Sequence, residues 1–411
     1  MFYGWYIVGS IAFINAIIGG ATTLGFTAMV DPIAATMSFS YAQISLATTL
    51  RGIESGVMNP FVGALSDRWP ARRLVFIGIA LLGLGLICLS QTRNLAMFYV
   101  SFVIMGIGGS LGTQMVPMAV VARWFRRNTG KAYGVMAAGI GAGGFLLPVV
   151  TRMIDAHGWQ NFLLWLALGV LAVGLPLSFV FRDRPEDSGL LPDGGPKVVS
   201  LDSPVPGAQE VSIGVKDAVK TRAFWFIAIA FMLQVAGGSA LMLHIMPYLT
   251  SLEIDRGTAS MITMLLSVVG IPSRFAMGWL CDIFRRNYVA AISLASTSIG
   301  LFLFSIIRSD SIWAIIGFIA FYSLGRGGQL SIMPTLIREH FGPAKFGSIF
   351  GLMSIFITLA VVTTPPLAGW VRDTQGDYGP IWLIFSSIGV VGVILALAIP
   401  RASRKLEPIT S

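Results

Sequence analysis

Charge and cysteine are both scarce in this chain. Only 11% of its 411 residues are charged, whereas 55% are hydrophobic. A soluble domain carries a surface that is roughly one quarter or more charged, so a soluble globular protein is excluded. The two cysteines, Cys88 and Cys281, lie in different apolar segments, which excludes a disulfide framework and a cysteine-based metal site. We expect both to be reduced, buried thiols that pack as small apolar residues.

What the chain does contain is a series of long apolar runs. A membrane-spanning helix needs about 20 apolar residues, and a backbone in lipid must satisfy its own hydrogen bonds, which favours helices over strands. The first run begins at Phe2 with no basic segment before it, so we interpret it as a retained span and not as a signal peptide. The pattern predicts an all-α membrane protein with twelve transmembrane helices, at residues 4–30, 41–65, 73–91, 95–122, 129–154, 159–181, 223–250, 258–281, 288–307, 311–337, 345–370 and 378–400.

The basic residues are concentrated in alternate loops between these predicted helices. One set of loops and the C-terminal segment are rich in arginine and lysine, whereas the other set holds only Arg93, Arg152, Arg256, Arg308 and Arg372. Basic loops stay on the cytoplasmic side, so this asymmetry places both termini in the cytoplasm, in a plasma or inner membrane. The net charge of +9 therefore indicates topology and contact with anionic membrane lipid, and it does not indicate a nucleic-acid site.

The chain divides into two halves with related sequence. The stretch from Arg182 to Arg222 is rich in proline and glycine and predicts a cytoplasmic linker. The segment GALSDRWPARR begins at Gly63 after the second predicted helix, and the similar GWLCDIFRR begins at Gly278 after the eighth. This repeat predicts two pseudo-symmetric six-helix bundles, residues 1–182 and 223–411, joined by residues 183–222. Such bundles rock around a site at their interface.

Ionisable residues inside the apolar segments need an explanation, because each charge costs about 2.5–3.5 kcal/mol at the centre of a helix. Arg274 lies eight residues before Asp282, about 12 Å from the end of its helix, too deep to reach the surface easily. Its planar guanidinium suits bidentate contact with a carboxylate. Arg274 is therefore the main candidate for binding an anionic substrate, and an internal ion pair is the alternative. The others are Arg51, Glu54, His244 and Arg326.

Several stretches resemble one transporter family. They are YGWYIV at 3–8, WFRRNTGKAYGVMAAGIGAGG at 124–144, RPEDSGLLPDG at 184–194 and SRFAMG at 273–278. Together with the Asp-Arg loop after the second helix, they make the chain resemble the major facilitator superfamily. Within it, the chain is similar to the monocarboxylate porter group, which includes the bacterial oxalate/formate exchangers. The resemblance implies the major facilitator fold for both bundles.

The resemblance also implies roles for particular residues. The family's eighth helix carries an arginine that binds the substrate carboxylate, and this position is Arg274. A latch that closes the cytoplasmic side is implied at Asp67, Arg68 and Asp282, with plain topology signalling as the alternative. The family often has an acid one turn before the arginine, where this chain has Gly270, so the usual neighbouring proton carrier is absent.

Three further residues are candidates for the site. His244 lies on the seventh helix, which lines the cavity in this superfamily, so it is a candidate substrate contact and proton carrier beside Arg274; a structural polar group is the alternative. Arg326, in the glycine-rich segment GRGGQ, either contacts substrate or pairs with a carbonyl or Glu54. Glu54 lies three residues from Arg51 on one helix face, which favours a mutual ion pair. The alternative makes Glu54 the proton carrier.

Neutral polar residues complete the candidate site. Gln114, Tyr133 and Tyr322, with Asn15 and Gln329, are able to hydrogen-bond to a small acid, and helix packing is the alternative role of each. Glycines at 139, 141 and 144 match G-x-G-x-x-G by count, but no strand precedes them, so a dinucleotide site is excluded. We expect no cofactor and no metal.

These observations predict a secondary active transporter of small organic anions, monocarboxylates such as lactate or pyruvate, that works by alternating access. Protons are the expected coupling ion, because no nucleotide-binding motif is present to drive transport. The alternatives are an exchanger of dicarboxylates and monocarboxylates, and a membrane receptor that does not transport. An enzyme is not indicated, because the sequence lacks a nucleophile arrangement and paired carboxylates. We expect a monomer.

Overall fold

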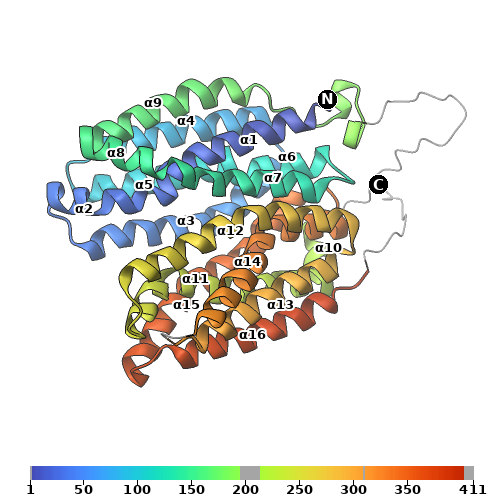
Figure 1. The fold of residues 1–411 in the computed structure, drawn as a ribbon. Helices are drawn as coiled ribbons and strands as arrows, with labels where there is room; N and C mark the ends of the chain where they lie inside the picture. The colour runs from blue at the N-terminus through green and yellow to red at the C-terminus, as the bar shows by residue number, and fades with distance from the viewer. Residues whose placement is uncertain (1, 195–212, 309–310, 402–411) are drawn as a thin grey trace, which may run out of the picture.

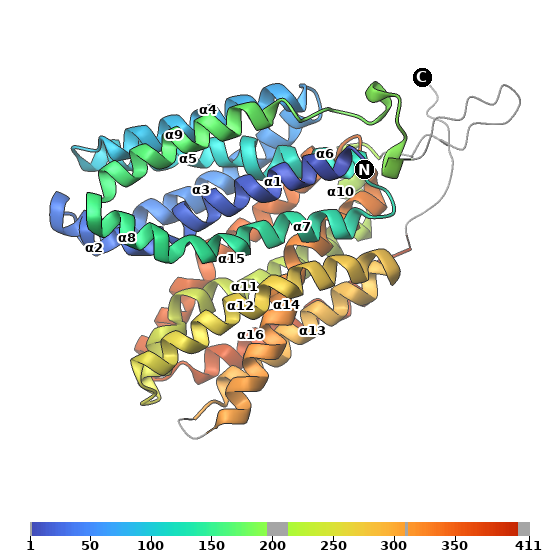
Figure 2. The same ribbon diagram turned by 45° about the horizontal axis from the view of Figure 1, so that its top comes forward.

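The computed structural model describes residues 2–194, 213–308 and 311–401, which form an all-helical protein. Two helical bundles lie against each other along their length (Figure 1). The N-terminus and the short helix α10 (Val215–Lys220) lie at the same end of the molecule in both views (Figure 2). We call this the terminal end and the opposite end the far end. The middle of the linker, 195–212, lies outside the described residues.

The N-terminal half consists of six helical units, several of them interrupted by a short turn of different pitch. The first unit is α1 (Gly4–Ile18), η1 (Gly19–Leu24) and α2 (Phe26–Met37); the second is α3 (Tyr41–Ser66) and the third is α4 (Ala71–Ser90). The fourth unit is α5 (Leu95–Gly109), η2 (Ser110–Gln114) and α6 (Met115–Trp124). The fifth is α7 (Thr129–Ala142), η3 (Gly143–Leu146) and α8 (Leu147–His157), and the sixth is α9 (Trp159–Ser178).

The C-terminal half repeats this arrangement with six helices that are each continuous. They are α11 (Arg222–Ser251), α12 (Arg256–Ile283), α13 (Arg286–Ser305), α14 (Ile312–Phe341), α15 (Phe346–Gln375) and α16 (Gly379–Leu397). The described parts of the linker add two single turns, η4 (Glu186–Ser188) and η5 (Pro192–Gly194), before α10. The predicted two-bundle, twelve-helix architecture is thereby confirmed.

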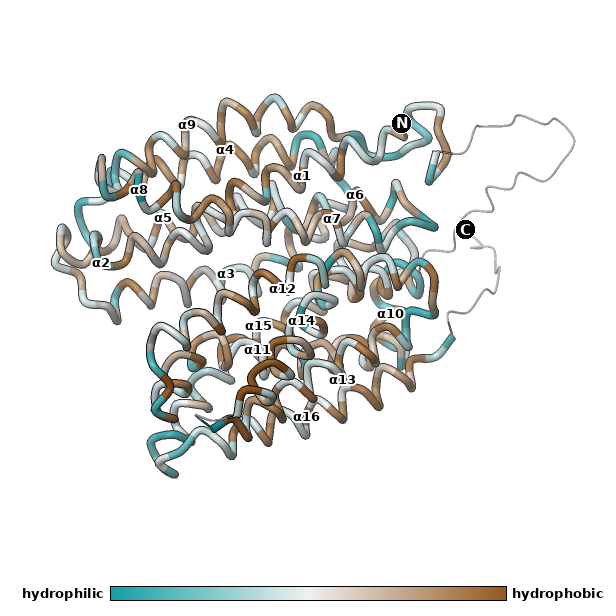
Figure 3. The backbone as a smooth tube through the Cα atoms, in the orientation of Figure 1, coloured by the Kyte–Doolittle hydropathy of each residue, from teal (hydrophilic) through white to brown (hydrophobic). Residues whose placement is uncertain are grey.

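The hydropathy of the chain accounts for ten of the twelve helical units as membrane spans. Ten are long and apolar enough to cross a membrane, and the two that are not are α3 and α14. Arg51 and Glu54 of α3 and Arg326 of α14 contribute to this lower hydropathy, together with neutral polar residues. Figure 3 shows apolar residues along the spans and hydrophilic residues at both ends of the bundles. The chain is therefore an integral, multi-pass membrane protein.

Three short turns of the N-terminal half differ from the straight helices that we expected. The segments Gly19–Leu24 and Ser110–Gln114 are π-helical, and Gly143–Leu146 is a 3-10 turn. Each of the three contains glycine, which lowers the cost of departing from α-helical geometry. The first span also runs past its predicted end at residue 30 to Met37, and it stops at Ser38, whose φ of 54° lies in the left-handed region.

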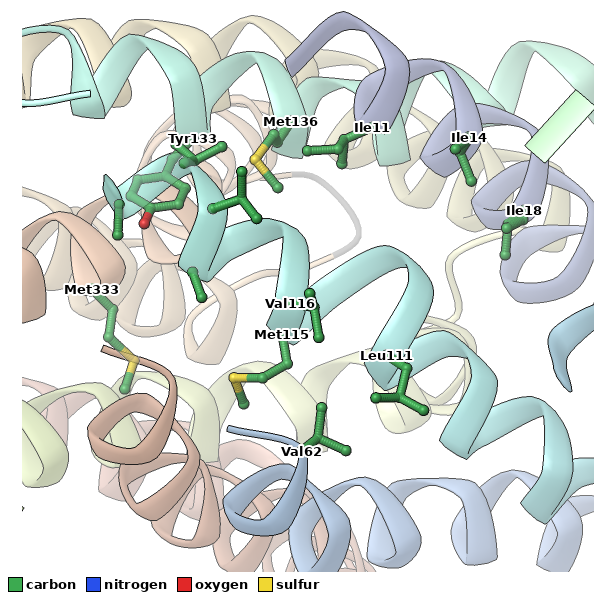
Figure 4. Close-up of a cluster of buried hydrophobic side chains, with 14 of the residues drawn as sticks. Ile11, Ile14, Ile18, Val62, Leu111, Met115, Val116, Tyr133, Met136 and Met333 are labelled. Atoms are coloured by element: carbon green, nitrogen blue, oxygen red, sulfur yellow. The ribbon is translucent and has the colours of Figure 1, made fainter. Parts of the chain in front are cut away.

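One hydrophobic core joins the two halves. Ile11, Ile14 and Ile18 form a stripe on α1 that faces the other helices of the N-terminal half (Figure 4). The same buried cluster includes Met333 of α14, from the other half. A second buried cluster is confined to the C-terminal half, around Tyr248 and Trp382. The halves are therefore packed together through side chains as well as linked by the chain.

Candidate functional site at the interface of the two halves

Two helix pairs hold the halves together: α3 packs along α15, and α7 packs along α12. Both pairs make backbone contact through glycine at the terminal end. A Cβ atom on Gly63 would overlap the carbonyl oxygen of Gly347, and a Cβ on Gly278 would overlap that of Gly130. The repeated segments that begin at Gly63 and Gly278 thus make equivalent contacts with the opposite half.

Two aspartates close these same contacts by capping helices of the opposite half. The backbone amides of Gly347 and Ser348, at the start of α15, donate to the Asp67 carboxylate over 3.1 and 3.0 Å, and the Ser348 hydroxyl donates over 2.6 Å. The amides of Gly130 and Lys131, at the start of α7, donate to Asp282 over 2.7 and 2.8 Å. A carboxylate at a helix N-terminus is stabilised by the helix dipole and by the unpaired amides.

Asp67→Asn should weaken the closed terminal end, because it removes the charge while keeping the size of the side chain. The loss of a charged helix cap costs about 1–2 kcal/mol, which corresponds to roughly a 5- to 30-fold larger open fraction. Cys281 is only 2% exposed beside Gly130 and becomes the sole cysteine after Cys88→Ser. Its alkylation rate in the membrane measures opening of the terminal end.

The control for this experiment is Asp187→Asn, at an exposed aspartate of the linker turn η4. Its alkylation rate should equal that of the parent protein. An Asp67→Asn rate equal to the parent would mean that the cap does not hold the halves together.

The arginines near the Asp67 contact are not the ones that the sequence indicated. Arg68 is exposed, and within the described ranges its side chain makes no hydrogen bond or ion pair. Arg123 of α6 lies there instead: it donates to the carbonyl of Ser66 over 2.6 Å and lies 3.9 Å from Asp67. Arg338 of α14 also crosses between the halves and donates to the carbonyl of Ala122 over 2.6 Å. Loop position alone did not distinguish these two from the other basic residues.

Arg274 lies on α12 at the interface, about 13 Å from the terminal end of that helix. Its guanidinium crosses to α7 and donates to the carbonyl of Ala137 over 3.3 Å. Gly141, one turn further along α7, leaves the space that the guanidinium occupies. In the described part of the chain, Arg123, Lys220 and Arg286 form ion pairs, whereas Arg274 forms none. The arginine is therefore held by a carbonyl and not by an acid.

A second guanidinium lies near the first. Arg326 of α14 donates to Gln329 and bonds to the Tyr322 hydroxyl, and it packs beside Gly238 of α11. Its positive charge is close enough to Arg274 to repel it. No ion pair among the described residues includes Arg326. The interface at this depth is therefore positively charged, and it attracts anions.

His244 lies at a different depth from Arg274. It is seven residues from the end of α11, or about 10 Å from the far end, whereas Arg274 is near the terminal end. Its Nδ1 lies 3.1 Å from the Tyr378 hydroxyl and its Nε2 lies 3.0 Å from the carbonyl of Pro365. His244 was expected beside Arg274, but the two residues lie at different depths, and the partners of the imidazole, Tyr378 and Pro365, are not on α12.

The chemistry of these partners defines the proton positions on the imidazole. The carbonyl of Pro365 only accepts, so Nε2 carries a proton, and the Tyr378 hydroxyl donates to Nδ1 in the neutral form. Burial raises the pKa of Tyr378, and Asp373 adds to that shift while Arg372 opposes it. The hydroxyl therefore stays protonated, and a proton that binds to Nδ1 must reverse this one hydrogen bond.

Glu54, Tyr133 and Tyr322, three further candidates from the sequence, contact different parts of the structure. Glu54 lies between α3 and α5, where Gly106 makes room for its carboxylate; its expected partner, the side chain of Arg51, lies outside the described residues. The Tyr133 hydroxyl donates to the carbonyl of Met118, and its ring stacks on Phe346 of the other half at 6.4 Å. Tyr322 contacts Arg326 and so positions a cation.

Gln114 is the most accessible neutral candidate. It ends the π-helical turn η2, and it is exposed although its neighbours Thr113 and Met115 are buried. A π-turn inside a helix often marks a functional position, because it changes the direction of the following side chains. The sequence showed the polar residue but not the turn that exposes it.

Two pseudo-symmetric helical bundles that meet at an interface are the architecture of many membrane transporters. The family model described as Major Facilitator Superfamily matches residues 11–273 and 235–410. The chain belongs to the major facilitator superfamily, and it is a transporter and not an enzyme.

Curated relatives confirm the resemblance to the monocarboxylate porter group. The chain is 25% identical to monocarboxylate transporter 12 of Rattus norvegicus, over 94% of this chain and 84% of that protein. It is 25% identical to monocarboxylate transporter 11 of Homo sapiens, over 85% and 73%.

Solved structures share the fold at low sequence identity. The proton:xylose symporter XylE bound to 6-bromo-6-deoxy-D-glucose matches with a TM-score of 0.76 and 17% identity, over 97% of this chain and 96% of that one. The human organic anion transporter MFSD10 matches with a TM-score of 0.71 and 14% identity, over 96% and 99%.

Proposed function

We propose that this protein is a secondary active transporter of small organic anions, monocarboxylates such as lactate or pyruvate, and that it is driven by protons. The observation that carries the proposal is the position of Arg274: a guanidinium at the interface of the halves, bonded to a carbonyl and to no acid among the described residues. A substrate carboxylate replaces the weak carbonyl contact with a stronger, charge-assisted one.

The position of Arg274 also supports alternating access. The guanidinium belongs to α12 and its carbonyl partner to α7, so the hydrogen bond joins the two halves. An anion that takes over the guanidinium removes this one contact between them. Substrate binding then favours opening of the terminal end, which the positive-inside rule assigns to the cytoplasm. Asp67 and Asp282 act as the latch that re-forms when the substrate has left.

The test is uptake of labelled lactate, pyruvate and oxalate into proteoliposomes under two driving forces. An inward proton gradient should drive monocarboxylate uptake in empty vesicles. Uptake that requires internal anion, with no response to the proton gradient, would contradict proton coupling and indicate exchange. The second guanidinium, Arg326, favours dicarboxylate exchange as the alternative, because two cations suit two carboxylates.

His244 is the proposed proton carrier, because it is partly buried at the wall of a cavity between the halves. His244→Gln keeps a donor for the Pro365 carbonyl but cannot take up a proton. Histidine changes charge between about pH 5 and 8, so proton-driven uptake by the parent should rise as external pH falls through this range. The variant should lose most of this dependence.

His340→Gln provides the control, since both ring nitrogens of His340 also have partners, the carbonyls of Leu336 and Pro400, but His340 lies at the terminal end of α14. Its pH profile should follow the parent. If His244→Gln retains the full pH profile, the proton is carried elsewhere, and Glu54 becomes the candidate to test.

A further inference from the structure

A cavity of about 450 Å³ lies between the two halves, separate from the Arg274 site. Gly52 of α3 forms one wall, Leu243 and His244 of α11 form another, and α15 supplies the rest through residues from Val361 to Gly369. Val361 lies fourteen residues before the end of α15 and Gly369 lies six, so the cavity occupies the half of the span nearer the far end. Cavities of this size hold small drug-like molecules.

The α15 wall contains two carbonyl groups without their usual donors. Pro365 and Pro366 have no N–H, so the carbonyls of Val361 and Val362, four residues earlier, each lose a helical hydrogen bond. Residues four apart lie on one helix face, and all four of these residues line the cavity, so the part of α15 that lacks these two hydrogen bonds forms its wall. No side chain in the described ranges donates to either oxygen. An unsatisfied carbonyl in an apolar site favours a ligand that brings a donor.

The other polar group at the wall offers no free donor. Both imidazole nitrogens of His244 are used, by Tyr378 and by the carbonyl of Pro365. Apart from His244, the lining residues are glycine, proline, leucine and valine, and none has a fixed charge. While His244 is neutral, a carboxylate would therefore lose its hydration in this cavity without a counter-charge, whereas a neutral N–H or O–H group would satisfy the carbonyls.

We propose that this cavity is a second binding site, which takes an uncharged and mainly apolar molecule that carries N–H or O–H donors, such as the primary amide of an arylalkyl acid. The occupant contacts α3 of one half and α15 of the other, the pair that packs along the interface. It therefore holds the halves in their present arrangement and inhibits transport without competing for Arg274.

The proposal is tested with three probes of one skeleton: 4-phenylbutyramide, its N,N-dimethyl amide, which has no donor, and the anion 4-phenylbutyrate. Binding is measured by titration calorimetry on the full-length protein in nanodiscs. The primary amide should bind at least about tenfold more tightly than the dimethyl amide. Equal affinity of the two amides would overturn the role of the carbonyls.

Gly52→Leu fills the cavity, because nothing lies within 4 Å of a Cβ at this position. It should weaken binding of the primary amide more than about tenfold. Gly9→Leu is the control, at an exposed glycine of α1 that also has nothing within 4 Å of its Cβ, and it should leave binding unchanged. Undiminished binding by Gly52→Leu would place the amide elsewhere and overturn the site.

Two further variants test the role of the ligand's N–H donors and separate this inference from the proposed function. The double change Pro365→Ala and Pro366→Ala restores an N–H to each carbonyl, so the affinity ratio of the two amides should fall from about ten to about one. An unchanged ratio would contradict the proposal. Arg274→Ala should bind the primary amide as tightly as the parent does, so loss of anion transport in that variant does not affect the test of the cavity. If Arg274→Ala no longer bound the amide, the amide would bind at the Arg274 site, and the proposal of a separate site would be overturned.

Discussion

Arg274→Ala should reduce the initial rate of labelled lactate or pyruvate uptake into proteoliposomes by about 100-fold. The variant removes the guanidinium that crosses from α12 to the carbonyl of Ala137 and has no acidic partner among the described residues. A hydrogen bond between charged groups contributes about 3 kcal/mol at most in this kind of site, and every 1.4 kcal/mol is about tenfold. Arg326 alone should not compensate, because Gln329 and Tyr322 hold it against α11.

Two further variants make the result specific. Arg274→Lys keeps the charge but loses the planar fork, so its uptake should lie between those of the parent and the alanine variant. Arg308→Ala removes an exposed arginine from a loop at the far end and should leave uptake unchanged. Parent-like uptake by Arg274→Ala would remove the basis of the substrate assignment.

Gly63→Val should open the terminal end and abolish most transport. A Cβ on Gly63 overlaps the backbone carbonyl of Gly347, which a side-chain rotation cannot relieve. Overpacking of this kind costs about 1–3 kcal/mol, so the closed arrangement should become up to about 100-fold less favourable. In a Cys88→Ser chain, Cys281 should react with a membrane-permeant maleimide correspondingly faster. This cysteine lies at the other contact, between α7 and α12, so it reports on the movement of whole halves.

Gly169→Val serves as the control for this experiment, because a Cβ on Gly169 of α9 meets nothing within 4 Å. It should leave both alkylation and uptake at the level of the parent. If Cys281 reacted fast in Gly63→Val while uptake stayed normal, closure of the terminal end would not be required for transport. If Cys281 reacted as slowly as in the parent, the α3–α15 contact would have accommodated the valine without moving the two halves apart.

The architecture could be predicted from the sequence because it depends on properties that are local in the chain. Apolar runs of spanning length fixed the number of helices, and the repeated segments at Gly63 and Gly278 indicated two halves. Both segments do make equivalent contacts, since each contains an aspartate, Asp67 or Asp282, that caps a helix of the other half. The turns at 19–24 and 110–114 could not be predicted, because a π-turn follows from packing between helices and not from composition.

Residue depth could be estimated from the sequence, but side-chain partners could not. The spacing of Arg274 from Asp282 indicated an arginine well inside its span, yet only the packing of α12 on α7 brings it to Ala137. The same counting, applied to His244, would have placed it near the far end; the expected contact with Arg274 ignored that helices α11 and α12 run in opposite directions. Arg123 and Arg338 were grouped with loop charges, although both reach across to a neighbouring span through hydrogen bonds to carbonyls.

The most direct measurement of the central claim is equilibrium binding of pyruvate to the purified protein and to Arg274→Ala, by titration calorimetry at neutral pH. Binding needs no conformational cycle and no driving gradient, so it isolates the contact between the guanidinium and the carboxylate. The account predicts saturable binding by the parent and at least about 30-fold weaker binding by the variant, with Arg308→Ala unchanged. Equal affinity of the parent and Arg274→Ala would contradict it.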